Sequence, residues 1–106
     1  MDYVLSVVGS NKFTEYHIFE RVMNSITQDN GKPTKILSIG RRGACNVAQR
    51  WAYIRDIDFK YLNSNQLDQF FGADIILTIP HEGDSWTEAF IEKAEEKGLN
   101  CVVHKV

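Results

Sequence analysis

The clearest chemical signature of the sequence is Gly40-Arg41-Arg42-Gly43. Guanidinium groups offer paired donors to a phosphate or carboxylate, and glycines let backbone N–H groups approach an anion where a helix begins. This composition is typical of an anion-binding turn. The alternative is a solvated basic turn, because paired surface arginines are ordinary in soluble proteins.

A second group of chemically active side chains lies between Pro80 and Glu88, where an imidazole, three carboxylates, a hydroxyl and an indole occur within nine residues. Glu88 is the candidate catalytic residue, because its carboxylate would accept ribose hydroxyls or stabilise an oxocarbenium-like centre, and Trp86 would offer a ring face to a base. The alternative is structural. Ser85 or Asp84 can cap a helix, and Glu88 would then be stabilised by the helix dipole.

A third candidate turn, Gly9-Ser10-Asn11, follows an apolar run. Gly9 permits a close backbone approach, and the Ser10 hydroxyl and nearby N–H groups could donate to a phosphate, although a simple turn has the same composition.

Cys45 is expected near a helix start, where the dipole could lower its pKa. No histidine lies close in sequence to act as its base, so packing is the favoured interpretation.

The elements that position these turns follow from hydrophobic periodicity. Short apolar runs predict strands at 3–8, 35–39, 58–62, 73–79 and 100–105. Helices are expected after Thr14 as its N-cap, over 44–52, within 63–71, and from Ser85 to a stop at Lys97-Gly98. In the first helix the apolar side chains recur at three- and four-residue spacing: Ile18, Phe19, Val22, Met23 and Ile26.

This alternation predicts an α/β fold, namely a single Rossmann-like domain over residues 1–106. Its five-stranded, mainly parallel sheet is expected in the order 3-2-1-4-5, counted along the chain, with helices on both faces. The three candidate turns would then leave the carboxyl ends of neighbouring strands and outline one ligand crevice.

Composition limits the function classes. The chain has 106 residues, of which 43% are hydrophobic and 25% charged, and its formal charge of −2 argues against a generally basic nucleic-acid surface. No apolar run is long enough to span a bilayer and no signal peptide is evident, so we expect a cytoplasmic protein without membrane contact. Cys45 and Cys101 lack metal-binding spacing, so we expect no disulfide, metal or cofactor. His17 and His104 are expected to be surface or packed residues.

Three segments together resemble the SLOG superfamily of Rossmann-like domains: Val7-Val8-Gly9-Ser10, Ile39-Gly40-Arg41-Arg42-Gly43-Ala44 and Ala73 to Pro80. That superfamily includes YspA-like proteins, LOG-type phosphoribohydrolases and the DNA-processing protein DprA, and its common theme is a nucleotide in this crevice. The resemblance runs nearly end to end. It implies a small-molecule nucleotide ligand.

The resemblance also carries a catalytic motif. LOG-type enzymes use a Pro-Gly-Gly-x-Gly-Thr-x-x-Glu loop, and matching from Pro80 places Ser85 at the threonine and Glu88 at the catalytic glutamate. Three glycines of that loop are replaced here, by His81, Glu82 and Asp84, which adds bulk and negative charge. Asn11 and Cys45 likewise stand where YspA-like relatives carry an arginine and an acidic residue.

Three functions follow from these observations. The first is a sensor or sequestering module that binds a nucleotide or nucleotide-derived ligand, and association as a homodimer or higher oligomer would suit so short a chain. The second is an N-glycosidic bond enzyme, phosphoribohydrolase-like or deoxyribosyltransferase-like, that uses Glu88. The third is DprA-like nucleic-acid binding, which ranks last. The expected ligand-binding residues are Gly9, Ser10, Asn11, Gly40, Arg41, Arg42, Gly43, Pro80, Ser85 and Trp86.

Overall fold

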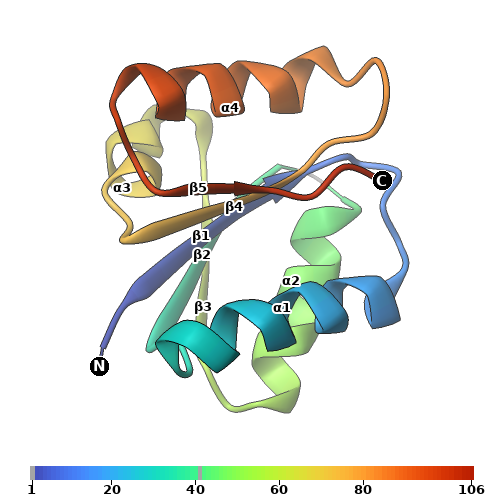
Figure 1. Ribbon diagram of the computed structural model, residues 1–106, viewed down its shortest axis with the longest axis vertical. Coiled ribbons are helices and arrows are strands. Elements are labelled where there is room, and N and C mark those ends of the chain that lie inside the picture. Colours follow the sequence, from blue (N-terminus) through green and yellow to red (C-terminus); the bar gives the residue numbers. More distant parts are fainter. Residues whose placement is uncertain (1, 41) are drawn as a thin grey trace.

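A five-stranded parallel sheet forms the centre of the computed structural model, which describes residues 2–40 and 42–106 (Figure 1). The strands are β1 (Val4–Gly9), β2 (Lys35–Ile39), β3 (Asp58–Leu62), β4 (Ile75–Ile79) and β5 (Cys101–Val103). Their order in space is β3-β2-β1-β4-β5, and every neighbouring pair is parallel. The predicted fold class and strand order are therefore confirmed.

Burial explains which runs make the central strands. The strands β1, β2 and β4 are apolar almost throughout and are buried on both faces, as expected for parallel strands covered by helices. The edge strands β3 and β5 are only partly buried. The strand predicted at 73–79 begins later, at Ile75, and the one predicted at 100–105 is shortened to Cys101–Val103. The first strand begins at Val4 and ends at Gly9 rather than running over 3–8.

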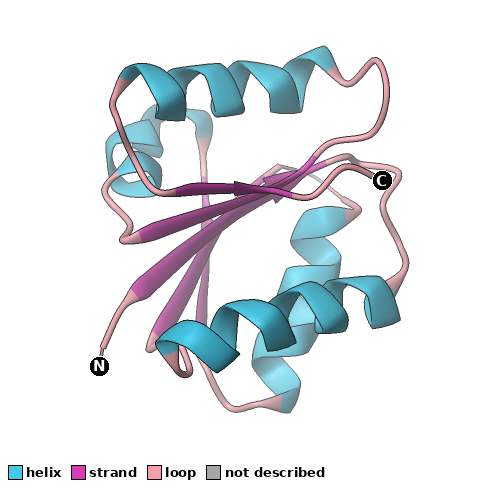
Figure 2. Ribbon diagram, in the orientation of Figure 1, coloured by secondary structure: helices cyan, strands magenta, loops and turns pink. Residues whose placement is uncertain are grey.

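Helices cover both faces of the sheet (Figure 2). On one face α1 (Tyr16–Asn30) and α2 (Ala44–Ile54) enclose the larger core cluster, which includes Phe19 and Trp51. On the other face α3 (Leu67–Phe71) and α4 (Ser85–Glu96) enclose a smaller cluster that includes Phe70. The helices change face once, where the strand order reverses between β1 and β4, and such a reversal leaves a crevice beyond the carboxyl ends of the strands.

The structure corrects three helix predictions. The N-cap of α1 is Glu15 rather than Thr14, because the helix begins at Tyr16 and Thr14 lies one residue too far back to reach the first free amides. The helix expected over 44–52 continues to Ile54. The helix expected within 63–71 is divided into a 3₁₀ turn, η1 (Ser64–Gln66), and the short α3.

The turns after β1 and β2 pack directly on each other at the crevice edge of the sheet. The Ala44 N–H donates to the Ser10 carbonyl at 3.1 Å, and the Ser10 N–H donates to the Ile79 carbonyl of β4 at 2.8 Å. Gly43 has a positive φ of 68°, and a β-carbon there would overlap the carbonyl of Ser10. Glycine at this position therefore lets the β2–α2 turn rest on the β1–α1 turn.

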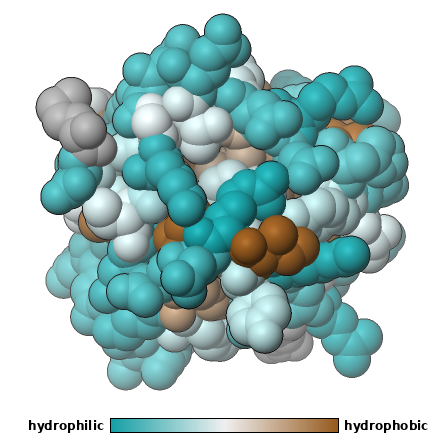
Figure 3. Space-filling view, turned by 90° about the horizontal axis from the view of Figure 1, so that it is seen from below, coloured by the Kyte–Doolittle hydropathy of each residue, from teal (hydrophilic) through white to brown (hydrophobic). Residues whose placement is uncertain are grey.

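Figure 3 shows the molecule from below, on the side of α1 and α2. Among the residues coloured there, hydrophilic side chains dominate, and the apolar ones occur as separate spots rather than as a broad patch. The exposed apolar residues of α2 are Tyr53 and Ile54. Within the described ranges, no helix is both long and apolar enough to cross a membrane.

Candidate functional site

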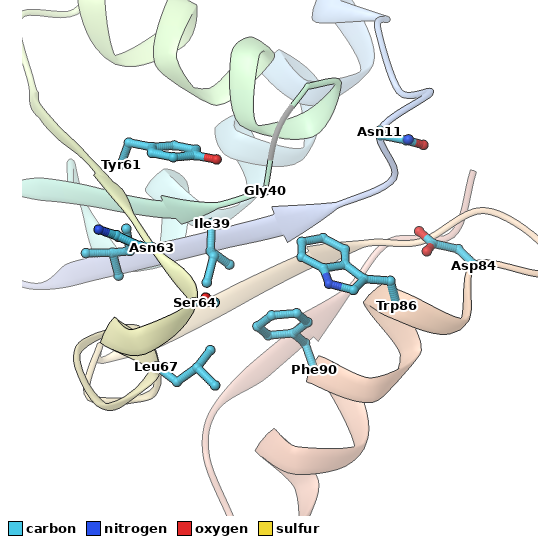
Figure 4. A pocket seen from close by; sticks show the side chains of 11 residues that line it. Asn11, Ile39, Gly40, Tyr61, Asn63, Ser64, Leu67, Asp84, Trp86 and Phe90 are labelled. Carbon is cyan, nitrogen blue, oxygen red and sulfur yellow. The ribbon is translucent and has the colours of Figure 1, made fainter.

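A cavity of about 670 Å³ lies at the carboxyl ends of β2 and β3, beside the start of α4 (Figure 4). Its volume is in the range of small-molecule sites, which favour an apolar lining with a few polar groups. This cavity has such a lining. The residues that line it are Asn11, Ile39, Gly40, Tyr61, Leu62, Asn63, Ser64, Leu67, Asp84, Trp86 and Phe90.

The α4 wall of the cavity is aromatic. Trp86 and Phe90 are four residues apart, so both project from the same face of the helix, and their rings meet edge to face with centroids 4.9 Å apart. The tip of the Trp86 indole extends over Gly40, where a β-carbon would lie 3.3 Å from Cη2. Glycine therefore lets the indole reach from α4 to the end of β2.

The opposite wall comes from β3 and the segment after it. Figure 4 shows Tyr61 on the β3 side of the cavity and Trp86 on the α4 side, with Leu67 and Phe90 toward the bottom of the view. Tyr61 is 53% exposed and Trp86 47% exposed, although both are large aromatic residues. Each therefore presents ring surface that a planar ligand could cover.

The sequence did not reveal most of the cavity lining. The lining residues that were not predicted as ligand contacts include Ile39, Tyr61, Leu62, Asn63, Ser64, Leu67 and Phe90. The sequence did contain a signal that could have identified the residues at the carboxyl end of β3 as part of the site. If 58–62 is a parallel strand, its carboxyl end must reach the same edge of the sheet as the other strand ends. Residues 61–64 then belong beside the predicted turns.

Asp84 brings a carboxylate to the cavity and is fixed by its role as the N-cap of α4. Its Oδ1 accepts from the Thr87 N–H at 3.2 Å, and its Oδ2 accepts from the Thr87 hydroxyl at 2.6 Å. The Nδ1 atom of His81 lies 3.9 Å from Oδ2, beyond hydrogen-bond reach. The helix dipole stabilises this negative charge, so the cap holds a preorganised acceptor at the cavity.

The predicted turn after β1 contributes one residue to the cavity, Asn11. Gly9 is enclosed by protein, since a β-carbon there would lie 2.7 Å from Ala44 Cβ and 2.8 Å from the Ile79 carbonyl oxygen. Ser10 is buried, and its hydroxyl accepts from the Lys12 N–H at 3.0 Å. Gly9 and Ser10 therefore shape the turn that carries Asn11.

The predicted anion-binding turn lies at the rim of the cavity. Gly40 lines it, and Arg42 is an exposed residue of the same turn. Gly43 is buried against the β1–α1 turn. Arg41 lies outside the described residues. The turn leads directly into α2, whose first-turn amides have no acceptor within the helix.

The predicted residues of the β4–α4 loop divide into two groups. Trp86 lines the cavity, whereas Pro80, Ser85 and Glu88 do not. Pro80 is buried, and its carbonyl accepts from the Val106 N–H at 3.0 Å. Ser85 and Glu88 are exposed. Because Glu88 is two residues from both Trp86 and Phe90, it projects about 200° around the helix axis from each of them.

Neither thiol is activated. Burial raises the pKa of Cys45, and a hydrogen bond to Ser38 opposes this shift only in part. Burial likewise raises the pKa of Cys101. These directions agree with the packing interpretation of Cys45. Among the described residues, no group of three or more His, Cys, Asp or Glu side chains is arranged to hold a metal ion.

Searches of protein-family models, curated proteins and solved structures found no match for the chain. The resemblance to the SLOG superfamily therefore stays a prediction that rests on the three sequence segments.

Proposed function

We propose that the protein binds a nucleotide or nucleotide-derived ligand in the cavity between β3 and α4, as a sensor or sequestering module of the SLOG type. The observation that carries the proposal is the aromatic lining, in which Tyr61 and Trp86 expose ring surface on two sides of a ligand-sized cavity. Stacking of a base on an aromatic ring contributes about 1–3 kcal/mol.

The charges around the cavity indicate which end of it would receive the phosphate of a nucleotide. Arg42 is exposed in the turn that begins at Gly40, and its guanidinium offers paired donors, so a phosphate is best received at this rim. The start of α4 is different. Its Thr87 N–H is already taken by Asp84, and the carboxylate repels a second anion. The phosphate is therefore assigned to the Gly40–Gly43 turn and the base to the aromatic walls.

The test is a thermal-shift and calorimetric screen of nucleoside monophosphates, NAD, ADP-ribose and cyclic nucleotides. A ligand at 100 times its Kd adds about 2.7 kcal/mol of stability, which for a domain of this size raises Tm on the order of 10 °C. Trp86→Ala should weaken that ligand at least about fivefold. Tyr53→Ala is the matched control, because Tyr53 is 85% exposed on α2 and does not line the cavity.

Two outcomes count against the proposal. One is that no nucleotide changes Tm. The other is that Tyr53→Ala weakens binding as much as Trp86→Ala does, since the effect would then not report on the cavity.

The enzyme alternative receives no support from the position of Glu88, which lies away from the cavity lining. Incubating a bound nucleotide and assaying for free base tests it directly. Base release that Glu88→Gln abolishes would favour the N-glycosidic enzyme over a binding module.

The nucleic-acid alternative needs several cations that are free to contact phosphates on one face of the protein. Two of the candidate arginines, Arg50 and Arg55, contact other side chains of the protein instead. Arg50 stacks over the Tyr16 ring at 4.6 Å, and Arg55 stacks over the Trp51 ring at 4.4 Å and pairs with Glu20 at 3.0 Å. The hydrogen bonds from Arg55 to Tyr16 and Glu20 occupy donors that a phosphate backbone would need, and stacking orients the Arg50 guanidinium along the Tyr16 ring.

A further inference from the structure

Asp84 has a place in the cavity that its capping role alone does not explain. Of the described residues that line the cavity, Asp84 alone carries a formal charge. Serine or asparagine would cap α4 equally well without bringing that charge to a ligand site. The side chain is 11% exposed, so its carboxylate is largely enclosed yet still faces the cavity.

The carboxylate also retains unused acceptor capacity. A carboxylate can accept about four hydrogen bonds, two on each oxygen. The Thr87 N–H uses one position on Oδ1, and the Thr87 hydroxyl uses one on Oδ2. One position on each oxygen is left for donors of a ligand, and both oxygens are held in place by the same threonine. This pair of acceptors matches two neighbouring hydroxyl groups.

The position of Asp84 decides which part of a nucleotide it meets. In Figure 4 the Trp86 indole lies between Tyr61 on one side and Asp84 and Asn11 on the other. A nucleotide that extends along the indole from Tyr61 toward Asp84 would have its base beside Tyr61 and its sugar near Asp84. The phosphate would follow toward Arg42 and Gly43, and Gly43 packs on the backbone of Asn11.

We infer that Asp84 accepts hydrogen bonds from the 2′- and 3′-hydroxyls of a ribose and thereby selects ribonucleotides over deoxyribonucleotides. This inference rests on the proposed function. It adds that the sugar of the ligand is ribose and that Asp84 is the residue that recognises it. Loss of a hydroxyl removes a hydrogen bond to a charged acceptor and leaves that acceptor without a partner. The cavity then discriminates by the sugar even where the base contacts are unchanged.

The experiment compares ribonucleoside 5′-monophosphates with their 2′-deoxy forms by calorimetry. We expect the ribose form of the best ligand to bind about tenfold or more tightly. Asp84→Asn should reduce that ratio to below about threefold, and because asparagine keeps the N-cap, Tm of the free protein should change little. Glu82→Gln is the matched control, since it removes a charge from the same loop at an exposed residue that does not line the cavity.

The outcomes separate the inference from the proposed function. If ribose and deoxyribose forms bind equally to the unaltered protein, the inference fails while nucleotide binding stands. The same holds if Asp84→Asn keeps the preference, or if Glu82→Gln abolishes it as well. If no nucleotide binds at all, the proposed function fails together with the inference. A preference that only Asp84→Asn removes confirms the inference.

Discussion

The Trp86 indole lies over Gly40, so that a β-carbon on this glycine would stand 3.3 Å from Cη2 of the ring. Trp86 starts from the first turn of α4, and Gly40 follows the last residue of β2. Both residues line the cavity, and the aromatic ring stays partly exposed there.

Trp86 should report ligand binding by fluorescence. The chain has two tryptophans, and Trp51 is 1% exposed whereas Trp86 is 47% exposed. Iodide should therefore quench Trp86 selectively, and a bound nucleotide should protect it. Trp86→Phe should leave an emission that iodide scarcely reduces. Equal quenching of that variant and the unaltered protein would show that Trp51 is accessible and would contradict the packing described above.

Alanine at Gly43 should destabilise the fold more than alanine at Gly98. The two glycines have nearly the same φ, 68° and 67°, but a β-carbon at Gly43 meets the backbone of Ser10 and Asn11, whereas one at Gly98 meets nothing within 4 Å. Backbone strain alone should cost Gly98→Ala about 1 kcal/mol. The clash should cost Gly43→Ala about 2 kcal/mol more.

Urea unfolding of both variants measures the difference. If the two substitutions lower the free energy of unfolding equally, the β1–α1 and β2–α2 turns are not in the close contact that the structure shows.

Removing the N-cap of α4 should be distinguishable from removing its charge. Asp84→Ala loses both bonds to Thr87 and should lower the free energy of unfolding by about 1 kcal/mol. Asp84→Asn should lower it by a few tenths at most, since asparagine is an equally favoured N-cap. Thermal denaturation without ligand measures both values. A loss for Asp84→Asn as large as for Asp84→Ala would show that the charge, rather than the two hydrogen bonds to Thr87, accounts for the stabilisation.

The thiols should be slow to react at neutral pH. Burial raises the pKa of Cys45 and Cys101 above the ordinary thiol value of 9.0, so little thiolate is present near pH 7. A raised pKa in the folded state stabilises the protein while the thiols stay protonated. That contribution is lost as the pH rises through the folded-state values, so stability should fall above about pH 9.

Reaction with a thiol-specific disulfide reagent at pH 7 and pH 10 tests this, with Cys101→Ser to isolate Cys45. Native Cys45 should react far more slowly than the same residue in urea. If native and urea-unfolded Cys45 react at comparable rates at pH 7, Cys45 is again a candidate nucleophile.

The fold could be predicted because its signals are local. Three strand runs are apolar on both faces and each ends at a glycine or proline or leads into one, so their type and parallel pairing follow from a few residues each. The errors are at the ends of elements. Thr14 has the chemistry of a cap, but the chain makes a turn from Ser10 to Phe13 and the helix begins only at Tyr16. Composition alone does not fix the residue at which such a turn ends.

The site could be predicted only in part, because glycine and serine have several uses. Gly9 and Gly43 were expected at a ligand, and the structure places protein atoms against both. Phe90 has the spacing of a core residue of α4, yet it is only partly buried and lines the cavity. Its ring packs against Phe70 and Phe71 of α3 and against Trp86, and the part that these residues leave uncovered faces the cavity. How far neighbouring helices cover a side chain depends on tertiary packing.

The cavity is assembled from segments that are far apart in the chain, since its lining runs from Asn11 to Phe90. No single strand–helix unit contains both aromatic walls. The site therefore exists only when β3 and α4 are both packed on the sheet, and its ligand can recognise only the folded molecule. Binding would accordingly slow amide hydrogen exchange across the whole sheet rather than at the cavity alone.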